Sequence, residues 1–310
     1  MPRLSMLCLC VLVATARAAP PPASGARDLR VATWNLEWLV APATAHAGRL
    51  ACDAGRRTAL PCDVARRLAR DSADHARLAA HARRLDADVI AVQEVEDETT
   101  LRRVFAGYRI CLAAGPGLQH TGFAVRAGLP HRCEPSLAAL SLEGRLRPGA
   151  LLTLWPDSGQ SITLLAVHLK SGCSSDPPGS ARAACRQLAT QMAHLAGWLD
   201  AQAAQHPQLI VLGDFNRAGP DAADPLWQGL LEHPALPLQD AAAGERFRNC
   251  YAGQPFWQPI DHILVSAALA PRLRAGSFRK HGYRSAEAVN YRLSDHCPVS
   301  IDIRPPGKSH

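Results

Sequence analysis

The sequence predicts an α/β protein that folds as one domain. Short runs of β-branched and aliphatic residues alternate with longer segments whose apolar residues recur at helical spacing. Residues 88–93 form a nearly continuous apolar run, which is typical of a strand buried on both faces. No Pro-, Gly- or Ser-rich linker divides residues 27–305, and no segment repeats at a fixed period, so a single domain is expected over this range.

The two ends of the chain are expected to lie outside that domain. Arg3 precedes a short apolar run, and small residues follow near Ala18 and Ala19, which is the pattern of a secretory signal peptide over residues 1–19. The apolar run is too short to span the roughly 30 Å hydrocarbon core of a membrane. Residues 20–26 would form a linker and residues 306–310 a tail. We expect a secreted or periplasmic monomer without an integral membrane segment.

The secondary structure is expected in the following order. A strand covers residues 29–34, and a long helix covers residues 63–85 with its Arg side chains in water. A second long helix begins after an N-cap at Ser180 and ends near Gln205. Further strands are expected over residues 88–93, 122–126, 151–155, 161–169, 209–212, 260–266 and 298–303.

The cysteines indicate disulfides. Ten are present, and removal of the signal peptide would take away Cys8 and Cys10 and leave eight. An oxidising compartment favours disulfides, although eight cysteines allow 105 connectivities. Closing a short loop costs less entropy than closing a long one, so we expect the pairs Cys52–Cys62, Cys173–Cys185, Cys111–Cys133 and Cys250–Cys297. No C-x-x-C pair occurs, which argues against a zinc site.

Polar residues lie at the ends of six of the apolar segments. They are Asn35 and Glu37; Gln93 and Glu94; His168, Lys170 and Ser171; Asp214 and Asn216; Asp261 and His262; and Ser294, Asp295 and His296. Positions i and i+2 of a strand share a face, so a pair such as Asp214 and Asn216 presents two oxygen-bearing groups to one side. Any single member is typical of a turn or a structural hydrogen bond. Six polar strand ends together indicate a catalytic site, because strand-end loops are where catalytic groups cluster.

These motifs resemble those of the endonuclease/exonuclease/phosphatase superfamily of DNase I-like proteins. They are Trp34-Asn35, Gln93-Glu94, His168-Leu169, Gly213-Asp214-Phe215-Asn216, Ile260-Asp261-His262 and Ser294-Asp295-His296, and they occur in the order of that family. The resemblance spans residues 31–303 and implies a four-layer α/β sandwich, in which two central mixed β-sheets are flanked by helices. It also implies hydrolysis of phosphate esters with a divalent metal at the open edge of the sheets.

The resemblance implies a metal site built from oxygen ligands. Mg²⁺ is expected, or Mn²⁺, with Ca²⁺ as a further candidate, and such hard cations prefer carboxylate and amide oxygens. Asn35, Glu94 and Asp295 can offer these oxygens, with Glu37 nearby as a ligand or directly behind one.

The resemblance also implies catalytic roles for the remaining residues. Asp214 would orient or deprotonate the attacking water, and Asn216 would hold a phosphate oxygen. Asp261 would fix the imidazole of His296, and His168 would clamp the phosphate or protonate the leaving group. The opposite assignment, with His296 as the base in place of Asp214, stays open.

Differences between this sequence and the motifs of particular subfamilies reduce the number of candidate functions. A His at position 168 does not match the apurinic endonucleases, and Arg217 directly after Asn216 does not match the inositol phosphatases. A binding protein on an inactive scaffold is disfavoured because all six motifs are intact. A phosphatase or a lipid phosphodiesterase remains the alternative, although an aromatic content of 5% argues modestly against lipid substrates.

Charge favours nucleic acid, DNA or RNA, as the substrate of an endonuclease. The formal charge is +7 for the full chain and would be +5 without the signal peptide. A basic surface attracts polyanions. Tyr283 and Tyr291 are placed where aromatic stacking could hold a base, whereas the Arg pairs between residues 56 and 84 are expected to be solvated helix faces. The expected substrate-binding residues are Lys170, Arg217, Arg279, Lys280 and Arg284.

Overall fold

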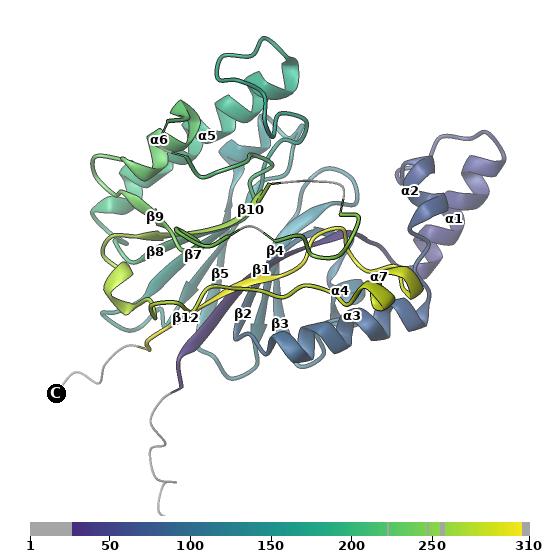
Figure 1. The fold of residues 1–310 in the computed structure, drawn as a ribbon, viewed down its shortest axis with the longest axis horizontal. Helices are drawn as coiled ribbons and strands as arrows, with labels where there is room; N and C mark the ends of the chain where they lie inside the picture. Colours follow the sequence, from purple (N-terminus) through teal and green to yellow (C-terminus); the bar gives the residue numbers. More distant parts are fainter. Residues whose placement is uncertain (1–26, 222, 247, 255–257, 306–310) are drawn as a thin grey trace, which may run out of the picture.

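Two six-stranded mixed sheets pack face to face between helices (Figure 1). The computed structural model describes residues 27–305 except 222, 247 and 255–257, so the predicted signal peptide, linker and tail lie outside the described residues. The first sheet has the order β11 (Arg279–Lys280), β12 (Val299–Ile303), β1 (Leu29–Leu39), β2 (Val89–Val95), β4 (His120–Arg126) and β3 (Tyr108–Ala113). The second has the order β5 (His131–Leu137), β6 (Gly149–Leu154), β7 (Ile162–His168), β8 (Leu209–Asp214), β10 (Asp261–Ser266) and β9 (Leu238–Asp240). The predicted α/β sandwich is confirmed.

The central strands are apolar on both faces because each face meets a different layer. In β1, Val31 packs between the two sheets, whereas Ala32 and Trp34 pack toward the helices. In β8, Ile210 packs between the sheets and Val211 packs toward the helices of the opposite side. The period of two along a strand thus divides its apolar residues between two cores.

Helices form the outer layers of the sandwich (Figure 1). The second sheet is covered by α5 (Ala183–Ala203) and α6 (Pro225–Leu231). The first sheet is covered by α3 (Ser72–Leu85) and α4 (Glu98–Arg102), and α7 (Ser285–Asn290) lies alongside α3. The helices α1 (Pro42–Asp53) and α2 (Cys62–Arg67) make a separate lobe with its own small core. Within the described ranges, no helix has both the length and the hydropathy that crossing a bilayer requires.

Two predicted helices have different bounds in the structure. The helix expected over residues 63–85 is two helices, because Asp71 begins α3 with a capping box, accepting from the backbone N–H groups of Ala73 and Asp74. The helix expected after Ser180 begins at Ala183 instead, since Arg182 keeps an extended backbone as its N-cap. It ends at Ala203 rather than near Gln205.

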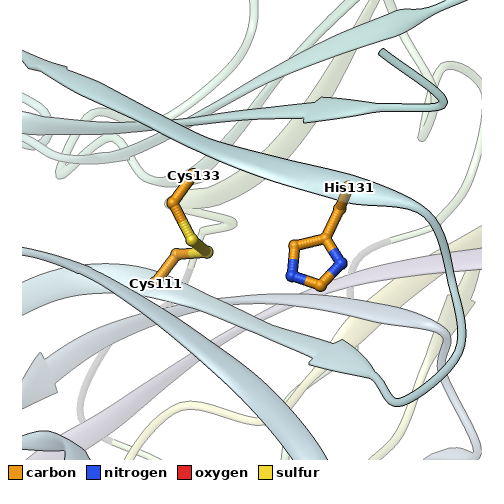
Figure 2. Close-up of side chains that lie close together, drawn as sticks. All are labelled: Cys111, His131 and Cys133. Atoms are coloured by element: carbon orange, nitrogen blue, oxygen red, sulfur yellow. A yellow bond between two sulfur atoms is a disulfide. The ribbon is translucent and has the colours of Figure 1, made fainter. Parts of the chain in front are cut away.

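All four predicted disulfide pairings are confirmed. Figure 2 shows the bond between Cys111 of β3 and Cys133 of β5, whose Cα atoms are 5.6 Å apart. Because β3 and β5 are edge strands of different sheets, this bond joins the two sheets at one side of the sandwich. His131 lies next to it, but both sulfur atoms belong to the disulfide and are not available as thiolate ligands.

Candidate active site

Strand register sets three of the predicted site residues in a row across the second sheet. Asp214 of β8 pairs with His168 of β7 on one side and with Asp261 of β10 on the other. Gly213 has a φ of +142°, and a Cβ atom there would collide with the carbonyl oxygen of Val167. The glycine of this motif is therefore required by the close approach of β8 to β7.

The first sheet contributes Asn35 and Glu94, which meet Asp214 across the sandwich. Asn35 Nδ2 donates to Asp214 Oδ2 at 3.0 Å and to Glu94 Oε1 at 3.2 Å. Asn35 Oδ1 accepts from the backbone N–H of Glu37 at 2.9 Å. The amide nitrogen, and not the oxygen expected to bind a cation, thus lies toward the carboxylates. In this arrangement Asn35 links the two sheets at the site.

Four residues around these strand ends have left-handed backbone conformations. Glu37, Trp38, Glu94 and Asn216 have φ values between 45° and 61°. Non-glycine residues adopt this region seldom, and such strain is concentrated at functional sites. Carboxylates of the site stabilise these backbone conformations. The N–H of Trp38 donates to Glu94 Oε2 at 3.1 Å, and the N–H of Asn216 donates to Asp214 Oδ1 at 2.8 Å.

His296 sits among three carboxylates. Its Nδ1 lies 2.7 Å from Asp261 Oδ2, which is the contact expected from the resemblance. Its Nε2 lies 3.9 Å from Asp214 Oδ2 and 3.8 Å from Asp295 Oδ1. The His296 backbone is fixed by the hydroxyl of Ser294, which accepts its N–H, and by that of Tyr283, which donates to its carbonyl at 2.6 Å.

Burial and charge give His296 and Asp214 shifted pKa values. Burial acts to lower the pKa of His296, but Asp261, Asp214 and Asp295 together raise this pKa well above its usual value. Burial raises the pKa of Asp214 to about 7, against the opposing effect of His296. At neutral pH, His296 is therefore a cation, and Asp214 holds a proton more readily than an ordinary carboxylate does.

His168 has the opposite electrostatic environment. Burial, with Arg147 and His296 adding to it, lowers its pKa well below the usual value, so the imidazole is neutral. Its Nε2 lies 3.6 Å from Glu94 Oε1 and 3.7 Å from Asp214 Oδ2. Its Nδ1 is buried without a hydrogen-bond partner among the described residues. A neutral imidazole suits donation of a hydrogen bond to a phosphate oxygen better than delivery of a proton.

The donors in the site fit a hard divalent cation. Glu94 shares a contact to His168 with Asp214, and Asp295 shares a contact to His296 with Asp214, with side chains of Glu94, Asp214 and Asp295 that are 14%, 2% and 29% exposed. The site residues whose ligand atoms lie within 4.8 Å of one another are Asp214, Asp261 and His296. Burial raises the pKa of Asp295 to about 6, which means that its negative charge is poorly stabilised by the protein alone. A bound cation would supply that stabilisation, and oxygen donors of this kind are what Mg²⁺ and Mn²⁺ prefer.

Glu37 supports the site from behind Asp295. Its Oε2 accepts from the backbone N–H of Asp295 at 2.8 Å, and its Oε1 accepts from Arg67 Nη1 at 2.6 Å. Both carboxylate oxygens therefore bind protein donors. Of the two positions expected for Glu37, the structure favours the one behind a ligand.

Three arginines of the site were missed by sequence reasoning. Arg67, expected on a solvated face, pairs with Glu37. Arg70 is 4% exposed and donates to backbone carbonyls of Glu37, Trp38, Arg292 and Leu293. Arg147 donates to the carbonyls of His168 and Leu169 at the end of β7. Each partner lies at least 21 residues away in the sequence, and no local sequence pattern marks pairings at that separation.

Two residues predicted to contact substrate are held inside the protein instead. Arg217 is 5% exposed and donates to Asp224 and to the carbonyls of Cys173 and Asp176, so it ties loops together. Tyr283 is 6% exposed, and its hydroxyl accepts from the indole of Trp34 while donating to His296. Its ring is part of the core and is not available to stack on a base.

The other predicted substrate-binding residues are on the surface but do not form one cluster. Lys170 follows β7, where its Nζ donates to the carbonyl of Ser171. Arg279 and Lys280 line a pocket beside Asp261. Arg284 precedes α7 and lines a different cavity.

Comparison with family models identifies the family of this chain. The sequence profile of the Endonuclease/Exonuclease/phosphatase family matches residues 32–296, which run from β1 to His296. A comparison of the sequence with curated proteins finds no match.

Solved structures share the fold at low sequence identity. Truncated TDP2 from Caenorhabditis elegans superposes with a TM-score of 0.57 at 17% identity, over 89% of this chain and 97% of that one. The human Nocturnin catalytic domain with bound sulfate gives 0.54 at 17%, over 90% and 95%. The 3'-5' exonuclease NExo from Neisseria meningitidis gives 0.57 at 19%, over 89% and 99%. With the family profile matching most of its length, this chain belongs to the endonuclease/exonuclease/phosphatase family.

Proposed function

We propose that this protein is a metal-dependent phosphodiesterase that cleaves DNA or RNA as an endonuclease outside the cytoplasm. The observation that carries the proposal is the contact of Asn35 with both Glu94 and Asp214, beside His168 and the Asp261–His296 pair. Hydrolysis of a phosphodiester needs neutralisation of the phosphoryl charge, an oriented water and stabilisation of the leaving oxygen. The site has a group suited to each of these tasks.

The pKa directions favour Asp214 as the general base. A carboxylate with a pKa of about 7 takes a proton from an attacking water more readily than an ordinary carboxylate does. His296 is held as a cation by Asp261, so it can donate from Nε2 to a phosphate oxygen while Asp261 accepts from Nδ1. His168 donates a second hydrogen bond. Asn216 Nδ2 donates to the carbonyl of Leu169 at 3.1 Å, so only its second N–H could contact the phosphate.

Glu94 and Asp295 would hold the divalent cation. When bound, the cation would lower the charge on the phosphoryl oxygens and stabilise the leaving oxygen. Glu37 and Arg67 keep the Asp295 backbone in position for this task.

Nucleic acid is favoured as the substrate by charge and by the structural relatives. The formal charge of the chain is +7, and one relative, NExo, has been solved bound to product DNA hairpin. Export is supported by the four disulfides, which form and persist in oxidising compartments.

A substrate panel tests this proposal. The purified protein is assayed with Mg²⁺ on supercoiled plasmid, single-stranded RNA, sphingomyelin vesicles and p-nitrophenyl phosphate, beside His296→Ala. His194→Ala is a matched control, because His194 is exposed on α5. We expect nicking of plasmid or cleavage of RNA, a loss in kcat of at least ~10²-fold in His296→Ala, and no loss in the control. Turnover of sphingomyelin or of the monoester alone would overturn the assignment to nucleic acid.

A further inference from the structure

The sandwich is open on one side, next to the catalytic pair. At the opposite side, the Cys111–Cys133 bond joins edge strands β3 and β5 (Figure 2). On the open side the edge strands are β9, with three residues, and β11, with two. A pocket of about 990 Å³ lies there, lined by residues of both strands and of β10. This volume is at the upper end of the roughly 300–1,000 Å³ typical of ligand sites and exceeds what one phosphate group needs.

Asp261 belongs both to this pocket and to the catalytic pair. Its Oδ2 accepts from His296, and its Oδ1 is buried without a hydrogen-bond partner among the described residues. Asp261 therefore borders both the pocket and the catalytic pair, so the pocket adjoins the site.

The pocket walls carry four cationic side chains. Arg246 and Arg248 come from the loop after β9, and Arg279 and Lys280 form β11. Among the described residues, no carboxylate forms an ion pair with Arg246, Arg248 or Arg279. Arg279 is anchored instead by hydrogen bonds from Nη1 to the carbonyls of Gly276 and Phe278.

The acidic groups of the pocket do not cancel this charge. They are Asp240, Glu245 and Asp261, of which Asp261 already binds His296. Burial raises the pKa of Asp240 to about 6, so part of its charge is lost in mildly acidic conditions. Burial also lowers the pKa of Lys280 to about 8, although Asp261 acts to raise it.

We propose that this pocket binds the phosphodiester backbone of a nucleic-acid strand on one side of the scissile bond, with Arg246, Arg248 and Arg279 contacting phosphates. The inference rests on the proposed function and makes it more specific: the enzyme selects polynucleotides over small diesters through contacts away from the reacting phosphate. Neutralising backbone phosphates contributes affinity that depends on salt, with a log–log slope of about 0.7 for each phosphate contact on a single strand.

Binding and hydrolysis are measured separately, so that failure of the chemistry is distinguished from failure of the pocket. Binding of a fluorescein-labelled single-stranded 12-mer is followed by anisotropy in EDTA, and hydrolysis of bis(p-nitrophenyl) phosphate is followed with Mg²⁺. The test variant is Arg246→Glu/Arg248→Glu. The control is Arg103→Glu/Arg109→Glu, which makes the same change in charge at exposed positions near the opposite sheet edge, after α4 and in β3.

The pocket variant is expected to weaken 12-mer binding at least ~10-fold and to lower the salt slope by about 1.4, for two lost contacts. Its kcat/KM for the small diester should stay within about twofold of the parent, and the control should bind the 12-mer within about twofold. Equal 12-mer binding by both variants would overturn the inference, as would an equal loss on 12-mer and diester. The inference would also be overturned if the parent protein bound anionic phosphatidylglycerol vesicles more tightly than the 12-mer and the pocket variant lost this vesicle binding. Absence of diester hydrolysis by the parent protein would contradict only the proposed function.

Discussion

Arg70→Met tests whether one buried arginine holds the site together. Arg70 donates to the carbonyls of Glu37, Leu293 and Arg292 at 2.7 Å each and to that of Trp38 at 3.2 Å. These carbonyls belong to the end of β1 and to the segment that leads into Ser294-Asp295-His296, so one guanidinium joins the chain around both parts of the site. Met keeps much of the aliphatic volume but removes every donor.

The magnitude follows from the carbonyls that lose their donor. Each buried acceptor left unsatisfied costs ~1–3 kcal/mol; the bonds to Glu37 and Leu293 are buried and those to Trp38 and Arg292 only partly, so taking the lower limit for the two buried acceptors gives about 2 kcal/mol. Domains unfold with ~5–15 kcal/mol, so Arg70→Met should remove a large part of the stability. The lower limit is used because removing the guanidinium also removes the cost of burying its charge.

Urea unfolding at 25 °C measures this loss, with Arg66→Met as the control. Arg66 is 57% exposed and lies 3.5 Å from Asp53, so its loss should cost less than ~1 kcal/mol. A free energy of unfolding for Arg70→Met within 1 kcal/mol of the parent would refute the reasoning. Where Arg70→Met does not fold, Arg70→Lys should fold with intermediate stability, because it retains a charge and some of the donors.

Three further predictions concern pH, a disulfide and the catalytic pair. His262 is buried with its pKa lowered to about 4 from 6.5, so its contribution to stability is fully present above pH 6.5 and about 3 kcal/mol is lost as the pH falls toward 4. His81 and His281 have pKa values lowered to about 4 as well, so His262→Gln should reduce the dependence in urea titrations from pH 7.5 to 4.5 without abolishing it. Cys111→Ser/Cys133→Ser opens a loop of 22 residues and should lower the free energy of unfolding by about 3 kcal/mol, whereas an unchanged urea midpoint would show that the bond does not stabilise the sheet edge. Asp261→Asn leaves His296 without its anionic partner at 2.7 Å and should lower kcat on a diester by at least ~10²-fold, a loss that Asp240→Asn should not show.

The fold was predictable because its signals are local or ordered along the chain. Apolar runs such as residues 209–212 mark buried strands, and the ordered motifs mark the strand ends where Asn35, Asp214 and His296 meet. The disulfides followed from loop length alone.

Other features could not be predicted because they depend on tertiary contacts. Arg67 was expected on a solvated helix face, but the break before Asp71 turns α2 toward Glu37. Arg217, directly after Asn216, and Tyr283, in the basic segment that precedes Asp295 and His296, were expected to meet substrate, but the structure uses them as internal hydrogen-bond partners. Edge strands as short as β11 have too few residues to show a period.

The most direct test of a metal-dependent site at Glu94 and Asp295 is a Mg²⁺ titration of diester hydrolysis. The protein is freed of metal with EDTA, and the rate on bis(p-nitrophenyl) phosphate is followed as Mg²⁺ is added, for the parent, Glu94→Gln and the control Glu98→Gln, whose exposed carboxylate pairs with Arg102. We predict no turnover without metal, full recovery in the parent and the control, and at least ~10²-fold lower activity at saturating Mg²⁺ in Glu94→Gln. Hydrolysis that persists in EDTA, or a Glu94→Gln protein that titrates like the parent, would contradict the account.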